Sequence, residues 1–363
     1  MAEEKKAIIT TIEDLNRMDD RSIQLVLRDV DQKDVVLALM DMKEPTRNRV
    51  MANLSRRAAA IVKDDMALAG KVDEKPIGEA CARIVNVLKR LVDMGEITVQ
   101  EGPSRTTSDP IRSQTVIESN VEIGETPPGQ RDLEGLVRYL QALARKSRCV
   151  GLLGIEPNVD RIDEELLRIG LEMVVDGTDY AVLDGILRER RKNLLAQYEQ
   201  RLDMIITAVD AISAGDSPSI MEAKCRARMA ANSKPARIMP DDTEGMDKEL
   251  AGPGPGKRDA EGLVHYFAAL ARKARMVGLL GIEDDVEKID EELARSGLRL
   301  IVDGTDRGFT KSILTSRKAA LLIQYGQRLN IIIDGAMAIS SGDNPVIVGA
   351  RCRAHIPAPV KWY

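Results

Sequence analysis

Two stretches of this chain repeat one another almost residue for residue. Residues 129–228 recur at 256–355 with a constant offset of 127 and without a gap. GLVRYLQALARKSRCVGLLGIE matches GLVHYFAALARKARMVGLLGIE, and IDEELLRIGLEMVVDGTD matches IDEELARSGLRLIVDGTD. A long internal repeat means that one folding module is used twice. The first hundred residues lack the pattern, so the sequence predicts a separate N-terminal unit followed by two copies of a second unit.

The residue types favour helices. Hydrophobic residues make up 44% of the chain but aromatic residues only 2%, and such cores suit packed helices better than β-sheets. Near the end of the first unit, apolar residues fall on one helical stripe at Ile77, Ala80, Ile84, Val87, Leu88 and Leu91. Pro45 fits the start of another helix, which continues to Gly70. We therefore expect an all-α protein.

Each copy also predicts one long helix with a narrow apolar seam. In the first copy the seam is Leu187, Leu194, Tyr198, Leu202, Ile205, Val209 and Ile212, and in the second it is Ile313, Leu314, Leu321, Tyr325, Leu329, Ile332 and Ile339. Steps of three, four or seven residues resemble those of a coiled coil, which needs a partner helix. The two long helices pack on one another, or helices from several chains pack together. After Ser213 and Ser340 the chain is expected to turn back.

The segments between these units read as flexible linkers. Residues 100–128 and 229–255 are rich in Ser, Thr, Pro and Gly and show no helical period. The expected domains are residues 1–99, 129–228 and 256–363.

Composition excludes several classes of function. A net charge of −5 argues against general nucleic-acid binding, which depends on a positive field. No run approaches the ~20 apolar residues of a membrane helix, and the N-terminus does not resemble a secretory signal. We expect a cytoplasmic protein with four reduced thiols and no membrane insertion.

The sequence offers little for catalysis. It has two histidines and no Ser/His/Asp or Cys/His constellation. GPGPGK at 252–257 lacks the Ser or Thr of a phosphate loop, and no strand precedes it. The repeated VDGTD motif could hold a cation, but the favoured interpretation is a helix end followed by an Asp cap, which explains the same residues without an ion. We expect no enzyme activity, cofactor or metal.

Three segments of the first unit carry a family resemblance. EDLNRMDDRSIQLVLRDVDQKDVVLALMDM, NLSRRAAAIVKDDM and IVNVLKRLVDMGEI resemble the C-terminal domain of the flagellar rotor switch protein FliG. The resemblance implies an armadillo-related helical bundle in which one helix presents charges to the stator. By position those charges are Arg57, Asp64 and Asp65. Met40 and Asp73 stand where the family has a lysine and an arginine, so a complete torque-bearing subunit is not expected.

Each repeat is similar to the cytoplasmic region of the stator protein MotA. The order LARKSRxxGLLxIE, GLxxVVDGTD and a long charged helix carries this resemblance. It implies that the charges facing the rotor are Arg148 and Glu156 in the first copy, and Arg275 and Glu283 in the second. The family's membrane helices are absent from the sequence, so ion conduction is not expected. Without the resemblance, these residues read as ordinary surface charges.

Together these features predict an adaptor or scaffold of the flagellar motor that binds rotor or stator components through charged helical surfaces. The alternative is a self-assembling structural protein, independent of flagella and homo-oligomeric. In either case, the N-terminal unit could dock on its own repeats or on those of another chain.

Overall fold

The computed structural model describes residues 9–70, 72–97, 110–229 and 243–357. Every element in these ranges is a helix, which confirms the prediction of an all-α protein. Contacts divide the chain into two compact units: residues 1–190 with 327–363, and residues 191–326. None of the described helices combines the length and apolarity of a membrane span.

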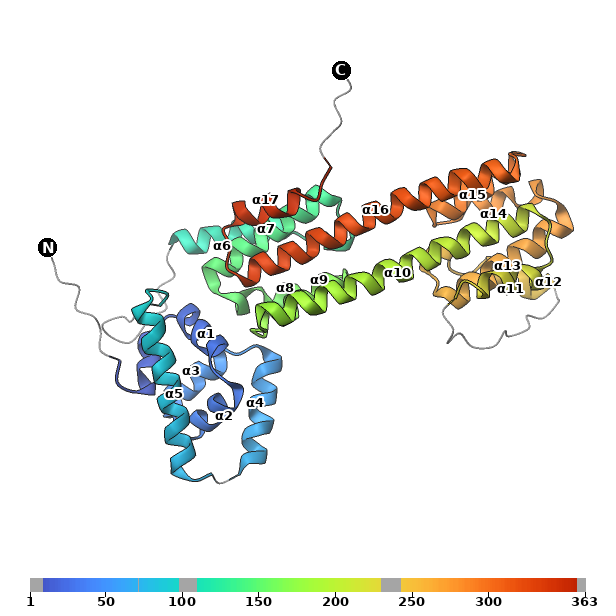
Figure 1. Ribbon diagram of the computed structural model, residues 1–363. Coiled ribbons are helices and arrows are strands. Elements are labelled where there is room, and N and C mark those ends of the chain that lie inside the picture. The colour runs from blue at the N-terminus through green and yellow to red at the C-terminus, as the bar shows by residue number, and fades with distance from the viewer. Residues whose placement is uncertain (1–8, 71, 98–109, 230–242, 358–363) are drawn as a thin grey trace, which may run out of the picture. The chain divides into compact units, whose positions relative to one another are not determined.

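The N-terminal domain is a bundle around one apolar core (Figure 1). Its elements are η1 (Ile12–Arg17), α1 (Asp20–Asp29), α2 (Gln32–Asp41), α3 (Glu44–Ala52), α4 (Arg56–Ala69) and α5 (Glu74–Asp93). The core includes Leu15, Met18, Ile23, Leu39 and Leu88. Asp19 and Asp31 cap α1 and α2 by accepting backbone N–H groups of the first turn. These short helices are therefore fixed by local caps and a shared core.

One predicted helix is two helices. The sequence predicted continuity from Pro45 to Gly70, but α3 ends at Ala52 and α4 begins at Arg56. The Ser55 hydroxyl accepts a hydrogen bond from the Ala58 N–H at 3.0 Å, which makes Ser55 the N-cap of α4. A serine side chain competes with the helical backbone in this way, and a new helix start is the result.

The two copies form the same elements in the same order. The first has η2 (Pro128–Gln130), α7 (Leu133–Val150), η3 (Leu152–Ile155), α8 (Glu156–Val159), α9 (Glu165–Val175), α10 (Tyr180–Ser213) and α11 (Pro218–Arg226). The second has η4 (Pro255–Lys257), α13 (Ala260–Val277), η5 (Leu280–Ile282), α14 (Glu283–Glu287), α15 (Glu292–Val302), α16 (Arg307–Ser340) and α17 (Pro345–Arg353). We call residues 128–175 the first head and residues 255–302 the second head.

Part of each predicted linker is helical. α6 (Pro110–Ile123) lies in the first linker and α12 (Thr243–Leu250) in the second. Ser119 and Ile123 of α6 are buried, and Arg131 donates hydrogen bonds to the Ile123 and Thr126 carbonyls at the end of this helix. These tertiary contacts offset a weak helical pattern, so the linker prediction is wrong for residues 110–123 and 243–250. Residues 98–109 and 230–242 lie outside the described residues.

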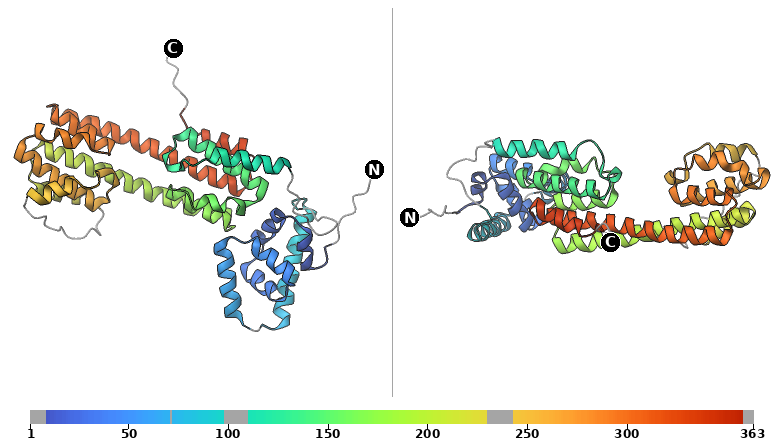
Figure 2. Two further views of the ribbon diagram at one scale, coloured as in Figure 1. Left: turned by 180° about the vertical axis from the view of Figure 1, so that it is seen from behind. Right: turned by 90° about the horizontal axis from the view of Figure 1, so that it is seen from above.

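Each head packs against the long helix of the other copy. In the first unit, Arg328 of α16 pairs with Glu164 at 3.0 Å and donates to the Arg131 and Pro128 carbonyls at 2.8 and 2.6 Å. Arg353 of α17 pairs with Glu134 of α7 at 2.6 Å, and the views agree that α17 lies beside α7 (Figure 2). The first head is therefore completed by helices of the second copy.

The second unit shows the reciprocal arrangement. Arg201 of α10 donates to the Arg258 carbonyl at 2.8 Å and also to that of Pro255. Arg226 of α11 pairs with Glu261 of α13 at 2.6 Å. These donors stand 127 positions before Arg328 and Arg353, so the same contacts are made twice.

The compact units thus differ from the domains expected at 129–228 and 256–363. The physical reason is helix length. A 34-residue α-helix is ~50 Å long, so the second half of α10 cannot return to the head from which it starts. It packs instead against the head of the other copy.

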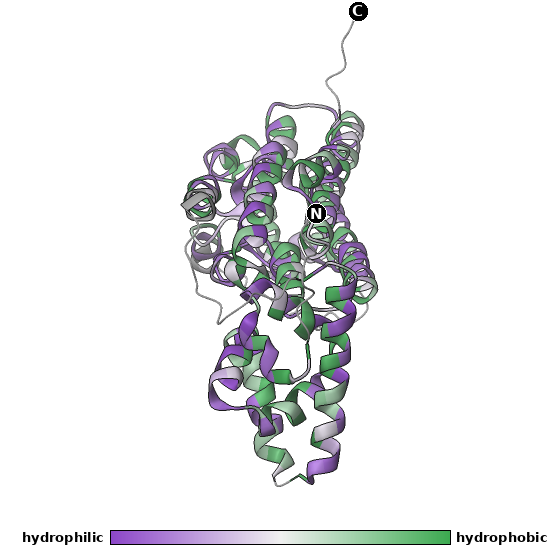
Figure 3. Cartoon of the chain, turned by 90° about the vertical axis from the view of Figure 1, so that its left-hand side faces the viewer, coloured by the Kyte–Doolittle hydropathy of each residue, from purple (hydrophilic) through white to green (hydrophobic). Residues whose placement is uncertain are grey.

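Within the second unit, the long helices run antiparallel. Arg307 pairs with Asp210 at 2.6 Å and Lys318 with Asp203 at 2.8 Å. The Tyr198 and Tyr325 ring centroids lie 4.8 Å apart. Hydrophilic and hydrophobic segments alternate along the helices of the N-terminal domain, in the lower part of Figure 3, as expected for amphipathic helices with one buried face.

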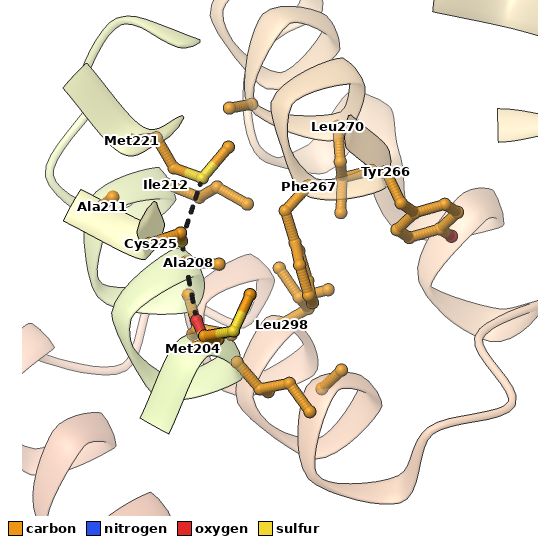
Figure 4. Close-up of a cluster of buried hydrophobic side chains, with 14 of the residues drawn as sticks. Met204, Ala208, Ala211, Ile212, Met221, Cys225, Tyr266, Phe267, Leu270 and Leu298 are labelled. Carbon is orange, nitrogen blue, oxygen red and sulfur yellow. Dashed lines mark hydrogen bonds between the residues drawn. The ribbon is translucent and has the colours of Figure 1, made fainter. Parts of the chain in front are cut away.

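The core of the second unit draws on both copies (Figure 4). Met204, Ala208 and Ile212 of α10 meet Phe267 of α13 and Leu298 of α15. All five side chains are buried. The exchanged helix α10 therefore contributes buried side chains to the core of this unit.

Candidate protein–protein interface

The N-terminus of α4 faces acidic residues of the first head. The Ser55 hydroxyl donates a hydrogen bond to Asp176 Oδ1. The Arg56 backbone N–H donates to Glu156 Oε1 at 3.0 Å. Because the N-terminal end of a helix carries a partial positive charge, carboxylates at this place are favourable.

Two arginine side chains strengthen this contact. Arg56 Nε lies 3.2 Å from Glu156 Oε1, and its Nη2 lies 2.7 Å from Asp160 Oδ2. Arg57 Nη1 lies 3.7 Å from Asp176 Oδ2. The hydrogen bonds that Arg56 donates to Asp160 and Glu156 raise the pKa of Arg56 above its usual value. Both arginines are exposed, so salt weakens these pairs and each contributes little alone.

α1 makes a second set of contacts, with the first head and with the end of α16. Gly151 has φ 79°, which favours glycine, and a Cβ on it would lie 2.3 Å from Gln24 Oε1, so the Gln24 side chain would have to move. Arg28 Nη1 donates to the Ser340 carbonyl, at the end of α16, at 3.4 Å. Next to these residues a hollow of ≈ 200 Å³ remains, lined in part by Leu27 and Leu152. The contact is polar and incompletely packed, which is typical of reversible association.

The structure places the predicted rotor-like charges at different parts of α4. Arg57 lies in the contact with the first head. Asp64 is exposed further along the helix, and Asp65 accepts a hydrogen bond from Gln32 at 3.0 Å. Only Arg57 is therefore brought to the first head.

The predicted stator-like charges also divide. Glu156 contacts Arg56, whereas Glu283 is exposed on the second head. Arg148 donates to the Gly342 carbonyl at 2.9 Å and Arg275 to the Gly215 carbonyl at 3.2 Å. Each arginine thus stabilises the end of the long helix contributed by the other copy.

Sequence reasoning missed Ser55, Arg56, Asp160 and Asp176. Asp176 belongs to VDGTD, for which the sequence predicts a helix end or a cation site. Arg56 is next to Arg57, which the family resemblance indicates. A serine cap followed by two arginines is the signal that could have indicated this helix end.

Among the described residues, no group of three or more His, Cys, Asp or Glu could hold a metal ion. The contact joins a helix end and arginines on one side to carboxylates on the other. Its chemistry is that of charge-guided recognition between helical domains. Fold and site together define a helical protein of several domains, in which charged groups join the N-terminal domain to the first head.

Comparison with known proteins gives the N-terminal domain a family. Residues 1–99 match the model of the FliG C-terminal domain, which confirms this part of the predicted resemblance. The flagellar motor switch protein FliG of Thermotoga maritima is 40% identical over 102 residues. Those of Borreliella burgdorferi and Bacillus subtilis are each 36% identical over 102 residues.

These matches cover 28% of this chain and 30% of each relative. The chain therefore spans less than a third of the length of these relatives. The likeness of residues 129–228 and 256–355 to the stator stays a prediction.

Proposed function

We propose that this chain is a non-conducting adaptor of the flagellar motor, at its cytoplasmic side. The observation that carries the proposal is the FliG C-terminal domain at residues 1–99, joined to two copies of a helical module. The stator resemblance of these copies adds to it, and the role is one of binding rather than catalysis.

The contact between α4 and the first head supports reversible binding. Its pairs are exposed and lie beside a hollow, so a competing charged surface can replace them. Asp64 stays exposed while Arg56 and Arg57 are engaged. The N-terminal domain can therefore meet a motor component through the middle of α4 without first leaving the head.

The test is direct binding of the whole chain to purified rotor and stator components of its host. We expect binding at low salt that weakens at physiological salt, because exposed charges are screened within ~8 Å at that ionic strength. Asp64→Lys is expected to reduce binding. Glu79→Lys, on an exposed position of α5, is the matched control. Failure to bind either component at low salt contradicts the proposal.

The second candidate is a self-assembling structural protein independent of flagella. It is favoured by the fact that the described contact of the N-terminal domain is with this same chain. Purified chain is then expected to gain mass with concentration in sedimentation, with no motor component present. A single, constant mass over a wide concentration range contradicts this candidate.

A further inference from the structure

The second head keeps most of the residues by which the first head holds the N-terminal domain. Glu283 stands at the position of Glu156, and Asp303 at that of Asp176. Gly278 and Gly304 stand at the positions of Gly151 and Gly177. We call Met276, Val277, Gly278, Leu280, Glu283 and Asp303 the second acidic face.

The backbone of this face has the same form. Gly278 and Gly304 have φ values of 81° and 78°, against 79° and 74° for Gly151 and Gly177. Beside the face, Arg275 holds the end of α10 just as Arg148 holds the end of α16. A domain that fits the first head therefore finds the same backbone conformation on the second head.

Unlike its counterpart, the second acidic face is uncovered in the described part of the chain. A Cβ on Gly278 would meet nothing within 4 Å, whereas one on Gly151 would meet Gln24. Met276, Val277 and Leu280 are 58%, 55% and 74% exposed. Apolar side chains gathered on a surface mark interaction sites. Here they lie on the second head, and the equivalent face of the first head contacts the N-terminal domain.

We propose that the second acidic face binds the N-terminal domain of a second copy of this chain, through Ser55, Arg56 and Arg57 at the start of α4. The charges are complementary, and this domain is seen to fit the corresponding face of the first head. The domain and the face are different surfaces of one chain, so the contact is head-to-tail. The inference deepens the self-assembly candidate and is independent of any role in flagella.

Two residue differences make the second face the weaker of the two. Glu287 stands at the position of Asp160, and it pairs with Arg299, whose Nε lies 2.9 Å from Glu287 Oε1. The first head has Glu172 at the position of Arg299. Arg56 would therefore compete with Arg299 for this carboxylate. The second face accordingly takes the domain when the first head releases it.

Glu156→Lys is expected to release the N-terminal domain from the first head, because it places a cation opposite Arg56. We expect this variant to associate in sedimentation as its concentration rises. Adding Glu283→Lys is expected to restore a single-chain mass, and so is adding Arg56→Glu with Arg57→Glu. Asp247→Lys, at an exposed position of α12 in the same unit, is the matched control and is expected to leave association unchanged.

A disulfide trap identifies the surfaces. A chain with Ser55→Cys and Glu156→Lys is mixed with a longer, tagged chain carrying Asp303→Cys, and the expected product is a covalent dimer linked between positions 55 and 303. Association without this link means that another surface is used, which overturns the inference but not self-assembly. When Ser55→Cys and Asp303→Cys are placed in one chain, a disulfide found only within monomers would mean that the chain's own N-terminal domain occupies the second acidic face. That result overturns binding by a second copy. No association by any variant overturns both.

Discussion

Cys225 and Cys352 occupy equivalent places in the two copies. The Cys225 thiol lies 3.7 Å from the Met204 carbonyl, and the Cys352 thiol lies 3.6 Å from the Ile331 carbonyl. Both thiols are free and buried, and burial raises the pKa of each to about 12. Each works as a small apolar side chain between two helices of its own copy.

These thiols give the fold a pH dependence. The ordinary thiol pKa is 9.0. Above pH 9, ionisation of these thiols therefore lowers the free energy of the unfolded chain, while the folded thiols stay neutral. This stability is fully present below pH 9 and is lost between pH 9 and about pH 12. The expected loss is about 1.4 kcal/mol per thiol per pH unit.

The measurement is urea unfolding at about pH 8 and about pH 10, for the wild type and for Cys225→Ala with Cys352→Ala. Other groups titrate in both proteins, so the difference between their losses isolates the thiols. The wild type is expected to lose about 3 kcal/mol more than the double variant between the two pH values. Equal losses contradict the assignment.

At the scale of elements, an arginine within each exchanged helix, Arg328 in α16 and Arg201 in α10, holds that helix to the head of the other copy. Arg328 and Glu164 are largely buried, with side chains 14% and 15% exposed, and Arg328 also satisfies two carbonyls of the first head. Removing one partner of such a pair leaves a charge and polar groups without partners.

Arg328→Ala is therefore expected to destabilise the first unit by about 3 kcal/mol. Arg168→Ala is the matched control. It removes an exposed pair with Glu172 one helical turn away, at an expected cost under about 0.5 kcal/mol. Hydrogen exchange in α7 and α9 reports the local stability. Equal effects of the two substitutions would mean that solvent screens the Arg328 pair.

At the scale of the whole molecule, neither copy is complete in itself. The first head packs against residues of α16 and α17, and the second head against residues of α10 and α11. The two copies therefore depend on one another for a core, as the subunits of a dimer with exchanged helices do.

A chain that ends at Met229 tests this dependence. It has the first head, α10 and α11, but no α16 to cover Leu140, which lies against Gly335. α10 and α11 complete a head of closely similar sequence in the second unit, so two truncated chains can complete one another. We expect a dimer in sedimentation. A well-folded monomer would show that one copy can cover its own head.

Much of the fold could be predicted because it depends on local signals. Helical spacing predicted the all-α class, and three segments predicted the FliG C-terminal domain. The helix break before Arg56 was missed because a single serine cap decides it. α6 and α12 were missed because contacts with the following segment, rather than their own pattern, stabilise them.

The candidate site was predictable only in part. Resemblance selected Arg57 and Glu156, which lie in one contact region, but it also selected Arg148 and Arg275, which hold helix ends. The difference lies in partners far apart in the sequence: Glu156 meets Arg56 across 100 positions and Arg148 meets Gly342 across 194. No local pattern encodes such a pairing.

By itself, the sequence determined that the chain is helical, that one module occurs twice and that the N-terminal domain belongs with FliG. These properties follow from residue spacing and identity, which act over a few turns of helix. Only the tertiary structure decided which copy covers which head, and which of two equivalent acidic faces holds the N-terminal domain. Both faces share most of their residues, and the residues that differ, such as Glu287 and Arg299, act only when folding brings them together.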